Sequence, residues 1–153
     1  MPRITEFFLV DTPAQDTAVI SAPIPERDIP EFIGRAFAEI GSTLWQEGSI
    51  AADCPFLRII PAEPGILNVT AGTAVSKPII GSGDVIPWQI PAGKKLFCYY
   101  QGDNALMEPV YGELAAFAKD RGFVMEEGVF EYYLNGPEYG TDKLLTRVMV
   151  LLS

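Results

Sequence analysis

The chain has 153 residues, of which 48% are hydrophobic and 20% charged, a size and composition typical of one globular domain with a packed core. It contains no histidine, which excludes Ser-His-Asp and Cys-His catalysis and removes nearly every zinc arrangement. With 20 acidic and 11 basic residues, the net charge is −9, which disfavours direct nucleic-acid and membrane binding and favours cationic partners. The alternative is that the excess of negative charge serves only to keep the protein soluble and does not indicate a cationic partner.

Other classes of site and location are also disfavoured by the sequence. The first residues lack the basic region and long apolar core of a secretory signal, so a cytoplasmic protein is expected. No GxxxxGK[ST] or GxGxxG phosphate loop and no calcium loop occurs, so we predict no cofactor and no metal. Cys54 and Cys98 have apolar neighbours, which favours buried, reduced thiols over a disulfide.

The first half of the chain predicts a strand, a helix and two strands. Residues 18–22 form the first strand, which the apolar run from Ile4 to Val10 could extend. The helix begins at Asp28, with Glu31 at capping-box spacing, and ends at Gly48. Its apolar stripe consists of Ile33, Phe37, Ile40 and Leu44. Two strands follow, at residues 56–60 and 66–75.

The second half predicts the same order of elements. A strand at residues 95–100 precedes a helix whose regular part begins near Glu108, because Pro109 suits only a first turn. Asp103 is interpreted as a helix-starting residue and Gly122 as the end. The helix's inward face carries Met107, Tyr111, Leu114 and Ala118. The final strands are predicted at residues 128–134 and 143–151.

The two halves also resemble each other at an offset of 74 positions. Phe56-Leu57-Arg58-Ile59-Ile60 matches Phe130-Glu131-Tyr132-Tyr133-Leu134, and both segments lie eight residues after a glycine, Gly48 or Gly122. We therefore predict an α+β fold, a duplicated strand-helix-strand-strand unit with an antiparallel sheet, two main helices and a ligand groove at the pseudo-twofold seam. The expected organisation is one domain, residues 1–153, with halves of about 1–76 and 93–153 and a connector at 77–92.

Several short motifs, in order and spacing, connect the chain to a known family. They are Ala18-Val19-Ile20, Ile29-Pro30, Gly48, Pro55-Phe56, residues 71–75 and 90–94, Gly102, residues 130–137 and Thr146-Arg147. With these motifs the chain resembles the GyrI-like small-molecule-binding domain, the effector-binding domain of bacterial transcription activators. The resemblance implies a duplicated unit with a ligand groove between its copies. It also implies membership in a family of drug-sensing modules, free-standing binding proteins and hydrolase-like proteins that act on strained cyclopropane compounds.

Two departures from the family pattern weaken the enzymatic interpretation more than the binding one. The family's His-x-Gly-Pro-Tyr segment is replaced by residues 100–104, Tyr-Gln-Gly-Asp-Asn. Phe130 stands where the family often has tryptophan before the strand glutamate, and the hydrolase-like members depend on that aromatic-glutamate pair.

Glu131 is the main candidate for a polar anchor. It interrupts an apolar strand, and its repeat counterpart is Leu57. Strand alternation places Tyr133 on the same face, which would give a carboxylate and a phenol if that face lines the cleft. Burial would raise the pKa of Glu131 and suit either a ligand cation or acid-base chemistry. The alternative is a solvated glutamate on an exposed face.

Aromatic side chains are the next candidates, because they stack on flat ligands and hold cations over their faces. Tyr111 would face inward from the second helix, and Trp88 could cover the cleft from the connector. Phe56 and Tyr100 are weaker candidates, and Phe56, like Trp45, also fits a plain core role. The acids near the last loop, Glu138 and Asp142, are interpreted as solvated turn charges.

Three functions follow from these residues. The preferred one is binding or sensing of a small lipophilic, aromatic or cationic molecule without catalysis; a role in transcription would then require a separate regulatory protein. The second is a small hydrolase in which Glu131 activates water with help from Tyr133. The third is a protein-interaction module resembling the gyrase-inhibiting family members.

Overall fold

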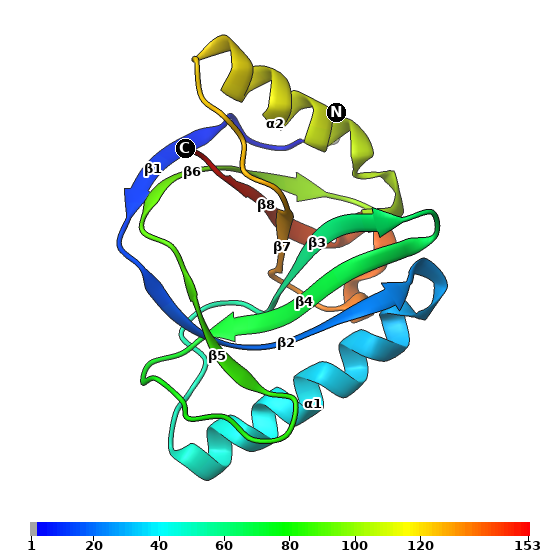
Figure 1. Ribbon diagram of the computed structural model, residues 1–153. Helices are drawn as coiled ribbons and strands as arrows, with labels where there is room; N and C mark the ends of the chain where they lie inside the picture. The colour runs from blue at the N-terminus through cyan, green and yellow to red at the C-terminus, as the bar shows by residue number, and fades with distance from the viewer. Residues whose placement is uncertain (1–2) are drawn as a thin grey trace. The chain divides into compact units, whose positions relative to one another are not determined.

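The computed structural model describes residues 3–153, which form two compact units (Figure 1). Unit 1 combines the N-terminal segment up to Pro13 with Ala92–Ser153, and unit 2 is Ala14–Pro91. Each unit contains one long helix and antiparallel strands, which confirms the predicted α+β class. The expected division into halves at 1–76 and 93–153 stays a prediction.

Unit 2 is a four-stranded antiparallel sheet with one helix packed against it. The strands pair in the order β5-β2-β4-β3, with β2 at Gln15–Pro25, β3 at Phe56–Glu63, β4 at Ile66–Ala74 and β5 at Ile86–Ile90. The sequence placed residues 77–92 in a connector, but part of this stretch is β5, which pairs with β2. The proline within β5, Pro87, and the mostly exposed side chains of this strand hid it from the sequence pattern, because an edge strand needs few apolar residues.

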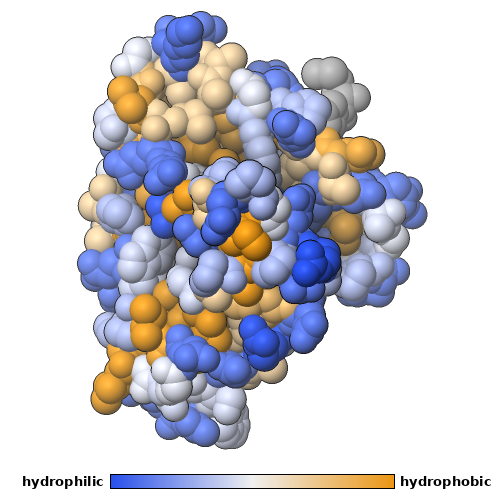
Figure 2. All heavy atoms as spheres, turned by 45° about the vertical axis from the view of Figure 1, so that its right-hand side comes forward, coloured by the Kyte–Doolittle hydropathy of each residue, from blue (hydrophilic) through white to orange (hydrophobic). Residues whose placement is uncertain are grey.

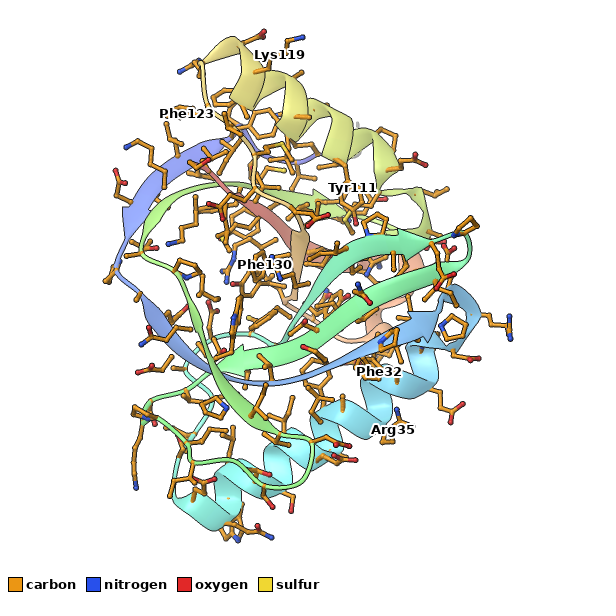
Figure 3. All side chains as sticks on the ribbon, in the orientation of Figure 1. Phe32, Arg35, Tyr111, Lys119, Phe123 and Phe130 are labelled. Atoms are coloured by element: carbon orange, nitrogen blue, oxygen red, sulfur yellow. The ribbon has the colours of Figure 1, made fainter. Side chains whose placement is uncertain are left out.

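Helix α1, Ile29–Glu47, packs on this sheet through buried side chains that recur about every four residues along the helix. The buried ones are Phe32, Ala36, Ile40, Thr43 and Leu44. Ile40 and Leu44 were predicted, whereas Ile33 and Phe37 lie half-buried at the flank because the small Ala36 faces the strands instead. Figure 3 shows Phe32 on the strand side of α1 and Arg35 on the opposite side.

The ends of α1 were predicted correctly in position but only partly in chemistry. A short 3-10 helix, η1 (Glu26–Asp28), leads into it, and the Asp28 side chain forms no capping hydrogen bond, so the expected capping box is wrong. The C-terminal prediction is confirmed: Gly48 has φ 68°, and its N–H donates to the carbonyls of the last turn, a left-handed cap that glycine adopts without strain.

Unit 1 is also a four-stranded antiparallel sheet with one helix. Its strands pair in the order β1-β6-β8-β7, with β1 at Phe8–Thr12, β6 at Gly93–Gln101, β7 at Val129–Tyr133 and β8 at Leu145–Leu151. Helix α2 is Glu108–Asp120, and short 3-10 helices lie at Asn104–Leu106 (η2), Pro137–Tyr139 (η3) and Thr141–Lys143 (η4). The N-terminal apolar run therefore does not extend the first strand of unit 2; it contributes to β1, which pairs with β6.

The core of unit 1 lies between α2 and one face of its sheet. Alternate residues of β6 and β8 meet the inward face of α2: Leu96, Cys98, Tyr100, Val148 and Val150 pack with Met107, Val110, Leu114 and Ala118. These are the periodicities of two in strands and about 3.6 in helices that the sequence displays.

The run of strand, helix, strand, strand occurs in each unit, as β2-α1-β3-β4 and as β6-α2-β7-β8. In both, the first and third strands of the run pair in the middle of the sheet. Duplication of the sequence itself, and a groove at a seam, stay predictions. Within residues 3–153, no helix has both the length and the apolar character that crossing a membrane requires.

Candidate ligand-binding site

Glu131 is a buried carboxyl in the middle of strand β7. Only 6% of the residue is exposed, and its neighbour across the sheet is Val148, which belongs to the apolar core under α2. The Glu131 side chain therefore points toward the helix of its own unit. The alternative of a solvated glutamate on an open sheet face is wrong.

Two phenols hold this carboxyl. The Tyr111 hydroxyl donates a hydrogen bond to Oε2 of Glu131, and the Tyr133 hydroxyl donates to Oε1 at 3.1 Å. Each carboxyl oxygen thus has its own donor, as a buried polar group requires. We name Tyr111, Glu131 and Tyr133 the carboxyl cluster.

Local structure explains how the cluster forms. Tyr133 is two residues after Glu131 on β7, so strand alternation places both side chains on one face. Tyr111 follows Val110 and precedes Leu114 on α2, at the edge of the stripe that faces the strands. In Figure 3 the Tyr111 side chain lies on the strand side of α2, whereas Lys119 projects away from the strands. The predicted inward orientation of Tyr111 agrees with this arrangement.

Burial dominates the electrostatics of the cluster. Removal from water raises the pKa of Glu131, and the hydrogen bonds from Tyr111 and Tyr133 only partly oppose this shift. Burial also raises the pKa of both phenols, and the neighbouring carboxylate raises it further. Tyr111 and Tyr133 therefore remain protonated donors, and Glu131 is the group whose charge can change.

Tyr100, also predicted for the site, forms a different contact in unit 1. It packs in the core under α2, and its hydroxyl donates to the backbone carbonyl of Asp103 at 2.7 Å. Asp103 in turn accepts a hydrogen bond from the Ala105 N–H at 2.9 Å and begins η2, which agrees with its predicted role at a helix start. The Tyr100 hydroxyl therefore fixes the loop between β6 and α2.

Phe56 and Trp88, the other predicted residues, belong to unit 2. Phe56 is fully buried against Gly72, which agrees with its interpretation as a core residue. Trp88 lies in strand β5 rather than in a connector, half-buried, with the Arg58 guanidinium 5.6 Å from the ring centre. The interpretation of Trp45 as a core residue is wrong, because 87% of this residue is exposed on α1.

Sequence reasoning missed an aromatic group on the sheet face of unit 1 that points away from α2. Phe8 stacks on Phe97 at 5.1 Å between ring centres, and Tyr99 meets both rings edge-on. Period-two alternation along β6 could have placed Phe97 with Tyr99, but the pairing of β1 with β6 was not predicted.

The carboxyl cluster can bind a cation or a hydrogen-bond donor, or exchange a proton, in surroundings that exclude water. Within residues 3–153, no three Cys, Asp or Glu side chains come together as a metal site would need.

Comparison with known sequences assigns the family. A profile of the GyrI-like small-molecule-binding domain matches residues 5–152. The chain belongs to the GyrI-like family. This confirms the resemblance read from the motifs. No curated protein matches the chain.

Solved structures share the fold at low sequence identity. The C-terminal domain of EcmrR aligns with a TM-score of 0.82 and 16% identity over 98% of both chains. EcmrR in its DNA complex aligns over 97% of this chain but only 57% of its own, with a TM-score of 0.80 and 17% identity. This GyrI-like chain thus spans little more than half of that regulator.

Two further structures that share the fold come from a hydrolase and from a protein solved with a ligand. A hydrolase from Listeria innocua aligns with a TM-score of 0.70 and 11% identity over 97% of this chain and 92% of its own. SAV2435, solved bound to tetraphenylphosphonium, aligns with a TM-score of 0.66 and 15% identity over 97% of this chain and 98% of its own. At such identities the alignments show a common fold and nothing more.

Proposed function

We propose that this GyrI-like domain binds or senses a small lipophilic, aromatic or cationic molecule, with Glu131 as the polar anchor. One observation carries the proposal: a carboxyl that is 6% exposed lies in an apolar core with a phenol on each oxygen. Fold stability alone gives no reason for a carboxyl there, because an apolar residue, like Leu57 in unit 2, would avoid the desolvation cost.

The contacts indicate how a ligand would engage the cluster. Both oxygens of Glu131 already accept hydrogen bonds, so a ligand donor must replace a phenol or draw charge onto the carboxyl. Tyr133 is fixed on the same strand, whereas Tyr111 belongs to α2. A cation near Glu131 would stabilise the ionised form that burial disfavours, and aromatic rings would contact its apolar surface.

The relatives support this class of ligand. The family is named for small-molecule binding, and SAV2435, which shares the fold, was solved with a lipophilic cation. A role in transcription would be exercised through a separate regulatory protein or a further part of the same regulator, as the layout of EcmrR suggests.

The test is calorimetric titration of the protein with tetraphenylphosphonium, compared with tetraphenylmethane-type neutral analogues made soluble by a polar substituent. We expect the cation to bind and Glu131→Gln to weaken it at least about ten-fold, since a buried carboxylate that pairs with a ligand charge contributes more than about 1.4 kcal/mol. Glu39→Gln, the same substitution on the exposed face of α1, should leave the affinity unchanged.

Equal affinity of the wild type and Glu131→Gln would reject Glu131 as the anchor. Turnover of a cyclopropane electrophile, abolished in Glu131→Gln, would instead establish the hydrolase alternative; the Listeria innocua hydrolase shares the fold. Phe130 in place of the family's tryptophan argues for binding rather than turnover.

A further inference from the structure

The solvent face of α1 in unit 2 carries no charge along its outermost line. Four residues, spaced by four, three and four positions, lie opposite the buried side chains of the helix, and all four are exposed. They are Gly34, Ala38, Gly41 and Trp45. A surface helix normally presents charged and polar residues along this line. We name these four residues the α1 outer face.

The C-terminal end of this face is strongly apolar and exposed. Trp45 is 87% exposed, although an indole ring is among the side chains that gain most from burial. Ile80, which is 89% exposed, is held beside the end of α1, because its N–H donates to the Glu47 carboxylate at 2.7 Å. In the lower part of Figure 2, at the height where Figure 1 shows α1, hydrophobic residues reach the surface among hydrophilic ones. Large exposed apolar side chains on fixed elements are typical of a protein contact.

The two glycines leave space on this face that the fold of one chain does not require. Within residues 3–153, a Cβ at Gly34 or Gly41 would meet no atom within 4 Å outside the backbone of α1. Glycine inside a helix costs about 1 kcal/mol relative to alanine. The two glycines therefore make α1 less stable, and they leave room on either side of Ala38 for a side chain from another molecule.

The order of large and small residues makes the α1 outer face complementary to itself. Along the helix, the midpoint between Gly34 and Trp45 coincides with the midpoint between Ala38 and Gly41. A two-fold axis through this point, perpendicular to the helix, would bring two copies of α1 together antiparallel. Trp45 of each copy would then lie over Gly34 of the other. Ala38 of each copy would lie over Gly41 of the other.

Charge favours the same occupant. Two copies that each carry a net charge of −9 repel each other, so close contact requires a surface without charge, and Glu31, Arg35 and Glu39 lie to one side of the α1 outer face. We propose that this face is the interface of a homodimer, in which two α1 helices pack antiparallel. One pair of helices buries less than the roughly 1,600 Å² of a typical stable interface, so we expect a dissociation constant on the order of 100 µM. The interface does not involve Glu131, so it stands or falls apart from the function proposed above.

The test is sedimentation equilibrium of the full chain between about 10 µM and about 1 mM. The mass should rise from monomer to dimer, and added salt should strengthen the dimer because it screens the charge of −9. The Trp45 indole leaves water in the dimer, so tryptophan emission should move to shorter wavelength over the same concentration range. A monomer at every concentration would overturn the proposal and would point to a different protein as the occupant.

Matched variants identify the helix pair. Trp45→Gly should raise the dissociation constant at least about thirty-fold, and Gly34→Trp should do the same, because two indoles would then meet at each end. The double variant exchanges the large and the small end, which restores complementarity, so it should recover most of the dimer. Leu106→Ala, which shortens a 67% exposed side chain in unit 1, should leave the dimer unchanged. A dimer that persists in both single variants, or a folded double variant that stays monomeric, would overturn the proposal; circular dichroism shows whether each variant is folded.

Discussion

The Tyr111 hydroxyl on α2 donates a hydrogen bond to Glu131 on β7, joining a helix and a strand at a buried carboxyl. Tyr111 is twenty residues earlier in the chain, so this contact exists only in the folded unit. The same bond couples the charge of Glu131 to the position of the helix.

Stability should depend on pH through Glu131. Its folded-state pKa is raised above the ordinary 4.5, mainly by burial, so its stabilising contribution is complete below pH 4.5 and is lost as pH rises through the folded pKa. Relative to Glu131→Gln, the wild type should therefore lose unfolding free energy as the pH rises from about 4 to about 8. Urea unfolding of both proteins measures this; parallel pH profiles would contradict it.

Cation binding should show the opposite pH trend. A cation favours the ionised carboxyl, so the affinity for tetraphenylphosphonium should fall as pH falls through the raised pKa of Glu131. Titrations across pH should show this dependence in the wild type and its loss in Glu131→Gln. If the variant retains the dependence, another group is responsible.

Removing either phenol should destabilise unit 1. Tyr111→Phe or Tyr133→Phe leaves one oxygen of a buried carboxyl without its donor, at a cost of about 1–3 kcal/mol. Tyr139→Phe is the matched control, because Tyr139 is 57% exposed and should change stability little. The measurement is the unfolding free energy by urea; equal values for all three variants would mean that the phenols do not support Glu131.

Gly72→Ala should destabilise unit 2 by about 1–3 kcal/mol through overpacking. A Cβ at this position would lie 2.6 Å from Val19 Cγ1 and 2.8 Å from Phe56 Cζ. Gly34→Ala on α1 meets no atom within 4 Å and should instead stabilise by up to about 1 kcal/mol, because alanine favours a helix. Thermal melts of both variants test this, and a neutral Gly72→Ala would show that Val19, Phe56 and the Ala18 backbone make room for the added methyl group.

The two thiols should differ in reactivity. Burial raises the pKa of Cys98 to about 11, and its side chain lies in the core under α2. Cys54 is only half-buried, contrary to the expectation that both are buried. A native-state thiol titration should therefore label Cys54 alone, and denaturant should release Cys98. Labelling of Cys98 at a similar rate would indicate opening of unit 1.

Local pattern was sufficient for most elements but not for their partners. The stripe of Leu114 and Ala118 predicted α2, and alternation predicted β6 and the shared face of Glu131 and Tyr133. Pairing of β1 with β6 joins residues far apart in the chain, which no local periodicity encodes. Strand β5 was missed for a related reason, since its pairing with β2 and not its composition makes it a strand.

The same distinction applies to the site. Glu131 could be singled out because it interrupts an apolar run that otherwise matches Leu57. Its second donor, Tyr111, could be predicted to face inward but not to reach that carboxyl, because the contact depends on how α2 packs on the sheet of unit 1.

The aromatic residues are divided between the units in a way that affects optical spectroscopy. Both tryptophans, Trp45 on α1 and Trp88 on β5, lie in unit 2, whereas all six tyrosines lie in unit 1: Tyr99, Tyr100, Tyr111, Tyr132, Tyr133 and Tyr139. Indole emission therefore reports on unit 2, and phenol absorption reports mainly on unit 1. One unlabelled sample can thus reveal whether the two units lose their structure together or in sequence.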